Sequence, residues 1–151
     1  MYAQARRGTE PAGAPALRLA LLKNGKDVTA LAKLAELYLG AGDVASALLL
    51  LERAEPLGGR KAVIKSLMGL TMEQLDEAQE AGDAFKEAVI LEPNDPQWHL
   101  NLAAHYAAFG YTDRAKAELK KAGTVPSAPR TPMDHPDVKL LSDLGNRMGA
   151  P

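Results

Sequence analysis

Small and large apolar side chains recur along this chain at a fixed interval. Shifting the sequence so that position 28 falls on 62, and 62 on 96, aligns three gap-free segments, 28–61, 62–95 and 96–129. Three positions of each segment hold only alanine or glycine: Ala35, Gly69 and Ala103; Ala47, Ala81 and Ala115; Ala54, Ala88 and Ala122. Large apolar residues stand one position before the first of these. Small residues beside large ones at helical spacing are typical of helices that cross at close range, so the pattern predicts three antiparallel helix pairs.

Turn residues indicate where the helices of each pair begin and end. In the first segment, Gly40 to Asp43 separate helices over about 28–40 and 44–55, with glycine as the C-terminal stop and Asp43 as the next N-cap. Asp95-Pro96 begins the first helix of the third segment, because the fixed φ of proline suits the first helical position. The second segment has no glycine at its turn, and Gly82 falls within its second helix. We therefore expect the second segment to be locally the least regular.

Both ends of the repeat array are expected to be capped, because a terminal repeat otherwise exposes an apolar face. Residues 15–23 continue the period as the second helix of a half-repeat, and residues 1–13 are expected to be disordered. At the other end, 130–151 is predicted to form a linker and a capping helix whose apolar stripe includes Val138, Leu141 and Leu144. In an alternative hypothesis this helix occupies the binding groove instead.

The spacing of the small, apolar and terminal proline positions resembles the tetratricopeptide repeat family. Met68-Gly69, Leu102-Ala103 and Pro93 carry the resemblance. It implies an all-α fold, a tetratricopeptide-type α/α superhelical solenoid of three helix-turn-helix repeats within 14–129, with an N-terminal half-repeat and a C-terminal capping helix. Trp98 stands one residue from the usual aromatic position, and Gly58-Gly59 replaces the usual proline of the first repeat.

The resemblance also implies that the first helix of each pair lines a concave groove that binds a peptide. Its candidate lining residues are Thr29, Lys33, Glu36, Leu67, Leu70, Glu73, Gln74, Gln97, Leu100, Asn101, Ala104 and Ala108. Only Lys33 and Asn101 stand where family members that clamp a C-terminal carboxylate carry cations and amides. The leucines and small residues instead favour an extended or helical apolar peptide, with Asn101 holding its backbone.

Composition removes several other classes of function. A net charge of −1 offers no field for nucleic acid or an anionic membrane, and no apolar run is long enough to span a bilayer. Without cysteine there are no thiolate ligands or thiol nucleophiles. His99 and His105 lack the spacing that places two imidazoles on one helical face for zinc, and no glycine-rich phosphate loop is present. We therefore expect a soluble, cytoplasmic protein with no enzymatic activity, cofactor or metal site.

Charge is unevenly distributed along the chain. Acids crowd 70–95, whereas 1–27 and 110–130 are basic. Such a strip usually only keeps a convex face solvated, but it can also attract a basic partner or drive head-to-tail self-association.

Two classes of function follow from the sequence. The first is an adaptor or chaperone that captures an apolar segment of a partner protein in the groove. The arrangement of an N-terminal helix, three repeats and a C-terminal helix is similar to that of small type III secretion chaperones. The alternative is a structural subunit of a larger complex or homo-oligomer that binds through its caps and its convex acidic face.

Overall fold

Helices account for almost all of the described part of the chain. The computed structural model describes residues 10–124, in which no strand occurs. The helices are α2 (Ala14–Lys23), α3 (Val28–Gly40), α4 (Val44–Ala54), the short 3-10 helix η1 (Glu55–Leu57), α5 (Lys61–Gln74), α6 (Ala78–Leu91), α7 (Pro96–Ala108) and α8 (Thr112–Thr124). The predicted linker and capping helix over 130–151 lie outside the described residues, as do residues 1–9 of the expected disordered N-terminus.

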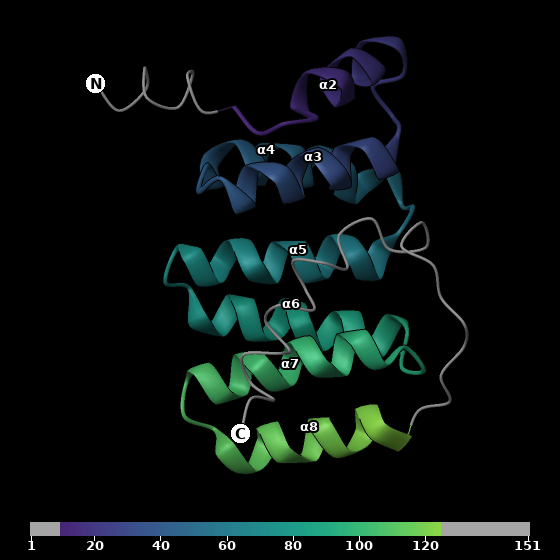
Figure 1. Cartoon of the computed structure of the whole chain (residues 1–151). Helices are drawn as coiled ribbons and strands as arrows, with labels where there is room; N and C mark the ends of the chain where they lie inside the picture. The colour runs from purple at the N-terminus through teal and green to yellow at the C-terminus, as the bar shows by residue number, and fades with distance from the viewer. Residues whose placement is uncertain (1–9, 125–151) are drawn as a thin grey trace.

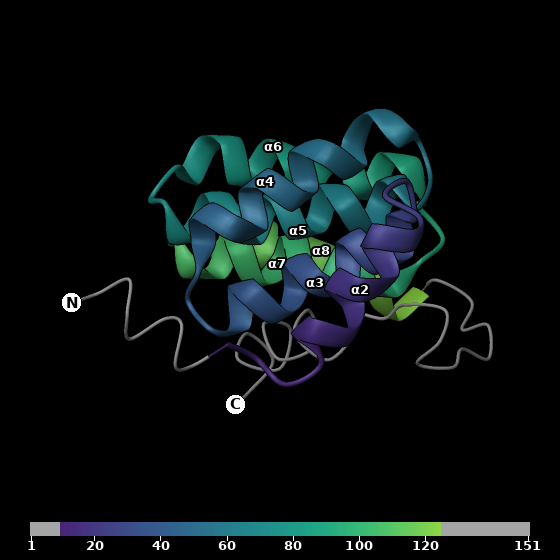
Figure 2. The same cartoon turned by 90° about the horizontal axis from the view of Figure 1, so that it is seen from above.

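The helices stack in chain order. Figure 1 shows α2 at the top, followed downward by the pairs α3/α4, α5/α6 and α7/α8. Seen from above, α4 and α6 lie along one side of the stack and α3 along the other (Figure 2). The first helices of the pairs contact one another in series, α3 with α5 and α5 with α7. Three helix pairs preceded by a single helix, as the repeat pattern predicts, therefore form the described structure.

The alanine and glycine positions that define the repeat are the points of closest helix contact. All nine of them are buried, and Ala122 is the most accessible at 9%. A Cβ atom added to Gly69 would lie 2.9 Å from two ring atoms of Phe85, which is itself 1% exposed. The ring of Phe85 thus occupies the volume that a side chain at position 69 would need.

Side-chain caps begin three of the helices. The carboxylates of Asp27, Asp43 and Asp95 accept hydrogen bonds from the backbone N–H groups of Ala30, Ser46 and Gln97, respectively. The cap predicted from the sequence, Asp43, is therefore confirmed, and Asp95 caps the helix that Asp95-Pro96 was predicted to begin. Each cap satisfies a backbone donor that the first helical turn leaves without a partner.

The second repeat differs from the sequence expectation. Asp76 takes the left-handed conformation, φ 60°, that a glycine would supply at this turn. Helix α6 runs unbroken past Gly82, which is buried. A Cβ at Gly82 would lie 3.0 Å from Nε2 of His105, so this glycine makes room for a neighbouring helix and does not interrupt its own.

Replacing Gly69 by alanine tests the close packing directly. We expect Gly69→Ala to lower the free energy of unfolding by about 1–3 kcal/mol, because the new methyl group must displace the Phe85 ring in a close-packed interior. Urea denaturation followed by circular dichroism measures this. Gly123→Ala is the matched control, since nothing lies within 4 Å of a Cβ there, and it should raise stability by up to about 1 kcal/mol. Equal effects of the two changes would contradict the packing argument.

Candidate binding surfaces

The predicted groove residues all fall on the first helices of the three pairs. Helix α3 carries Thr29, Lys33 and Glu36, and α5 carries Leu67, Leu70, Glu73 and Gln74. Helix α7 carries Gln97, Leu100, Asn101, Ala104 and Ala108. Because these helices contact one another in series, the predicted residues lie on neighbouring elements. The surface that α3, α5 and α7 form together is here called the first-helix face.

Burial divides this set. Leu67 and Asn101 are completely buried and Leu70 is 5% exposed, with both leucines in the hydrophobic core cluster. Leu100 and Ala104 are partly exposed, and Gln74 and Ala108 are exposed. Of the three leucines expected to form shallow apolar pockets, Leu100 alone presents appreciable surface. A charged substitution at Leu70 would therefore disturb the core and not only the groove.

Two predicted groove residues are engaged by side chains outside their own helix. Oγ1 of Thr29 on α3 accepts a hydrogen bond of 2.9 Å from Nε of Arg60, the residue before α5. The carboxylate of Glu73 lies 2.7 Å from Nδ1 of the buried His105 on α7. The first contact links the two ends of the first repeat, and the second joins the second repeat to the third. Thr29 and Glu73 thus help to hold the helices together.

Two buried polar atoms of the first-helix face have no hydrogen-bond partner among the described residues. They are Oγ of Ser66 on α5 and Nδ2 of Asn101 on α7, and both side chains are 0% exposed. Oδ1 of Asn101 accepts a hydrogen bond of 3.1 Å from Nε2 of Gln97, one turn earlier. A buried polar atom without a partner costs about 1–3 kcal/mol, so these atoms mark a place where polar groups are needed.

His99 links α7 to the end of the second repeat and to α8. Its Nδ1 lies 2.9 Å from Oε1 of Glu118 on α8, and its Nε2 lies 2.8 Å from the carbonyl oxygen of Pro93. Both ring nitrogens therefore face acceptors, and the side chains of His99 and Glu118 are both buried. Within residues 10–124 no group of three or more histidine, aspartate or glutamate side chains is placed to hold a metal ion. His135, the remaining histidine, lies outside the described residues.

The exposed acidic and the exposed basic side chains gather on different helices. Of the eight acids in 70–95, Asp95 is buried, Glu73 lies against His105, and Glu92 accepts a hydrogen bond from the Trp98 indole. The remaining five are exposed, on α6 and the turn before it. Exposed bases gather on α8: Arg114, Lys116, Lys120 and Lys121.

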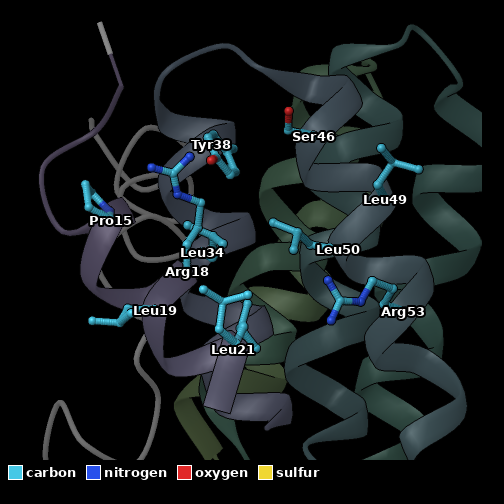
Figure 3. A pocket seen from close by; sticks show the side chains of 11 residues that line it. Pro15, Arg18, Leu19, Leu21, Leu34, Tyr38, Ser46, Leu49, Leu50 and Arg53 are labelled. Carbon is cyan, nitrogen blue, oxygen red and sulfur yellow. The ribbon is translucent and has the colours of Figure 1, made fainter. Parts of the chain in front are cut away.

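An apolar cleft opens between α2 and α4 above α3, and the sequence analysis did not identify it. Its volume is about 830 Å³, with Leu21, Leu34 and Leu50 among its lining residues. Figure 3 shows Leu50 and Arg53 extending from α4 toward α2. Exposed leucines of α2 and α4 also line the cleft, among them Leu19 and Leu49. A signal was present in the sequence, because Leu19 and Leu49 stand at positions where the other repeats carry charged or small residues.

Solved structures with a similar fold include two of MamA. The structure described as "Crystal structure of MamA" superimposes with a TM-score of 0.62 and 22% sequence identity, over 89% of this chain and 81% of that chain. The second, "MamA MSR-1 C2", gives a TM-score of 0.58 at 23% identity, over 75% of this chain and 65% of that chain. No family model and no curated protein matches the chain.

These similarities define the fold class. The chain is an all-α, tetratricopeptide-type α/α solenoid, as the repeat pattern predicts. At this level of identity the likeness concerns the fold alone. No helix in the described part of the chain is both long enough and apolar enough to cross a bilayer.

Replacing His99 tests its structural role. We expect His99→Leu to lower the free energy of unfolding by about 1–3 kcal/mol, because it leaves Pro93 O and Glu118 Oε1 without this partner. Thermal and urea denaturation measure the change, with the exposed Gln79→Leu on α6 as control. The double variant His99→Leu, Glu118→Leu should lose less than the two single variants added together. Simple additivity would show that the two side chains are not coupled.

Proposed function

We propose that this chain is a protein–protein interaction module, of adaptor or chaperone type, that holds an apolar segment of a partner protein along the first-helix face. The observation that carries the proposal is the buried, unpartnered Nδ2 atom of Asn101 on α7. A backbone carbonyl group of an added peptide would give this atom the acceptor that it lacks.

The surroundings of Asn101 suit such a ligand. Gln97 and Ala104 lie one helical turn on either side of it, and both are partly exposed. Ala104 and Ala108 allow a peptide backbone to approach closely, and Leu100 offers apolar surface beside them. The lining is more apolar than charged, which favours an apolar segment over a terminal carboxylate.

A binding role also agrees with the environment of the two described histidines, the side chains best suited to catalysis. His99 and His105 are buried and lie against acceptors within the fold, at 2.7 to 2.9 Å. Neither ring stands beside a nucleophile in the described contacts. We therefore propose binding and not catalysis as the activity of this chain.

Blocking the first-helix face should abolish partner capture. Partners retained by the wild-type chain from an extract of its source organism are identified by mass spectrometry, and their affinities are measured by calorimetry. We expect Ala104→Arg with Ala108→Arg to weaken binding by at least about tenfold, because the long side chains occupy the space of the peptide. The matched control is Ala45→Arg with Ala117→Arg, two exposed alanines on second helices. Equal loss in both double variants would place the binding surface elsewhere.

Asn101→Leu separates binding from stability in the same assay. Leucine removes the unpartnered donor, so stability should stay the same or rise, whereas affinity should fall because the ligand loses a hydrogen bond. A variant that lost stability and kept its affinity would show that Asn101 serves the fold.

A second candidate function rests on the separation of exposed charge between α6 and α8. Acids on one helix and bases on another allow copies of the chain to associate in a head-to-tail array, as a structural subunit would.

Light scattering over a range of concentration and ionic strength tests this second function. We expect the mean mass to rise with concentration and to fall with salt, because salt screens exposed charges. Glu80→Lys with Asp83→Lys should remove the concentration dependence, and Lys116→Glu with Lys120→Glu should do so independently. Combining all four changes should restore association. A constant monomer mass would exclude this function.

A further inference from the structure

Clefts lie at three places along the stack of helices. The first lies between α2 and α4, the second between the end of α4 and α6, and the third between α6 and α8. Their volumes are about 830, 310 and 390 Å³, respectively. Because positions one repeat apart correspond, the residues that line the first cleft can be compared with those at the same positions of the other repeats.

The first cleft is lined by leucines at positions where the other repeats carry polar or smaller residues. The corresponding positions of successive repeats are Leu19, Arg53 and Glu87; Leu21, Glu55 and Val89; and Leu49, Asp83 and Ala117. The leucines are therefore a property of the first cleft and not of the repeat. Leu19, Leu22 and Leu49 are 57%, 83% and 65% exposed. Contiguous exposed apolar surface of this kind marks an interaction site.

Charged side chains that contact one another or aromatic rings line the second and third clefts. In the second, the Lys65 ammonium bridges Glu55 and Glu87, and hydrogen bonding to Glu55 raises the pKa of Lys65 above its ordinary value. In the third, the guanidinium of Arg114 lies 5.9 Å from the ring centre of Tyr106 and 5.2 Å from that of Tyr111. The described residues that line the first cleft form no bridge of this kind with one another, and its leucine floor stays open.

The charges around the first cleft indicate what kind of surface it accepts. Its two charged lining residues are Arg18 on α2 and Arg53 on α4, and none of the described lining residues is acidic. Arg18 pairs with Glu10 at 2.8 Å, and Nη2 of Arg53 donates to the carbonyl oxygen of Gly25 at 3.2 Å. A guanidinium has five donors, so both arginines retain N–H groups for a further carboxylate.

We propose that this cleft docks an amphipathic helix of a partner protein, with an apolar ridge seated between α2 and α4 and acidic residues on its flanks facing Arg18 and Arg53. A groove between two helices accepts the ridge of a third helix. The described helix at the far end of a second copy is a poor match, because the exposed face of α8 is polar and basic. The proposal is independent of ligand binding at the first-helix face.

A designed peptide tests the proposal on the full chain. The probe is a fluorescent helix of about five turns, with leucines at helical spacing on one face and glutamates on both flanks, read by anisotropy. We expect saturable binding that Leu19→Glu with Leu49→Asp weakens at least about tenfold. These substitutions install side chains that other repeats carry at the same positions, Glu87 and Asp83. The matched control, Leu75→Asp with Ile90→Glu, changes exposed apolar residues outside the cleft and should leave binding intact.

Each other outcome overturns the proposal. Absence of saturable binding to the wild-type chain excludes the cleft as a helix-docking site, and equal binding to the cleft variant places the probe elsewhere. A probe with lysines in place of its glutamates should bind at least about tenfold more weakly, so equal affinity contradicts the role of the arginines. If the wild-type chain is a dimer in light scattering and the cleft variant is a monomer, a second copy of the chain is the occupant.

Discussion

The close approach of antiparallel helices at alanine and glycine positions is the constraint on which the rest of this structure depends. Where two helix backbones approach this closely, a larger side chain has no space, as the ring of Phe85 against Gly69 shows. The large apolar residues beside these positions fill the remaining volume and form one continuous core from α2 to α7. Each repeat is therefore positioned by its neighbours, and the face that it presents depends on this contact.

Polar contacts add to the apolar packing, both within a repeat and between successive repeats. Arg60 reaches back to Thr29, and Glu73 lies against His105. Within the third repeat, His99 joins α7 to Glu118 of α8. Because these side chains are committed within the fold, several residues with the chemistry of a binding or catalytic site serve its architecture. What remains for a partner is surface: part of the first-helix face, the N-terminal cleft and the exposed charges of α6 and α8.

Repetition of the backbone has not produced repetition of the surface. Of the three clefts between second helices, one is lined by an ion-pair bridge, one by an arginine beside two tyrosine rings, and one is largely apolar. The positions that face solvent are free to vary because they do not decide whether the helices can approach. A solenoid of this kind can therefore carry several different binding surfaces without a change of fold.

The sequence by itself determined the period, the helix pairs and most helix ends. The predicted first helix, 28–40, agrees with the observed one, and Asp43 and Asp95 cap the helices that they were expected to begin. These features depend on local turn chemistry and on steric limits that recur in every repeat. Only the tertiary structure decided that Leu67 and Leu70 are enclosed while Leu100 is partly exposed, and that Glu73 lies against His105. It alone showed that leucines of α2 and α4 line one cleft. The reason is physical. The exposure of a side chain and its hydrogen-bond partners depend on how closely a neighbouring repeat approaches, and a short stretch of sequence does not specify that distance.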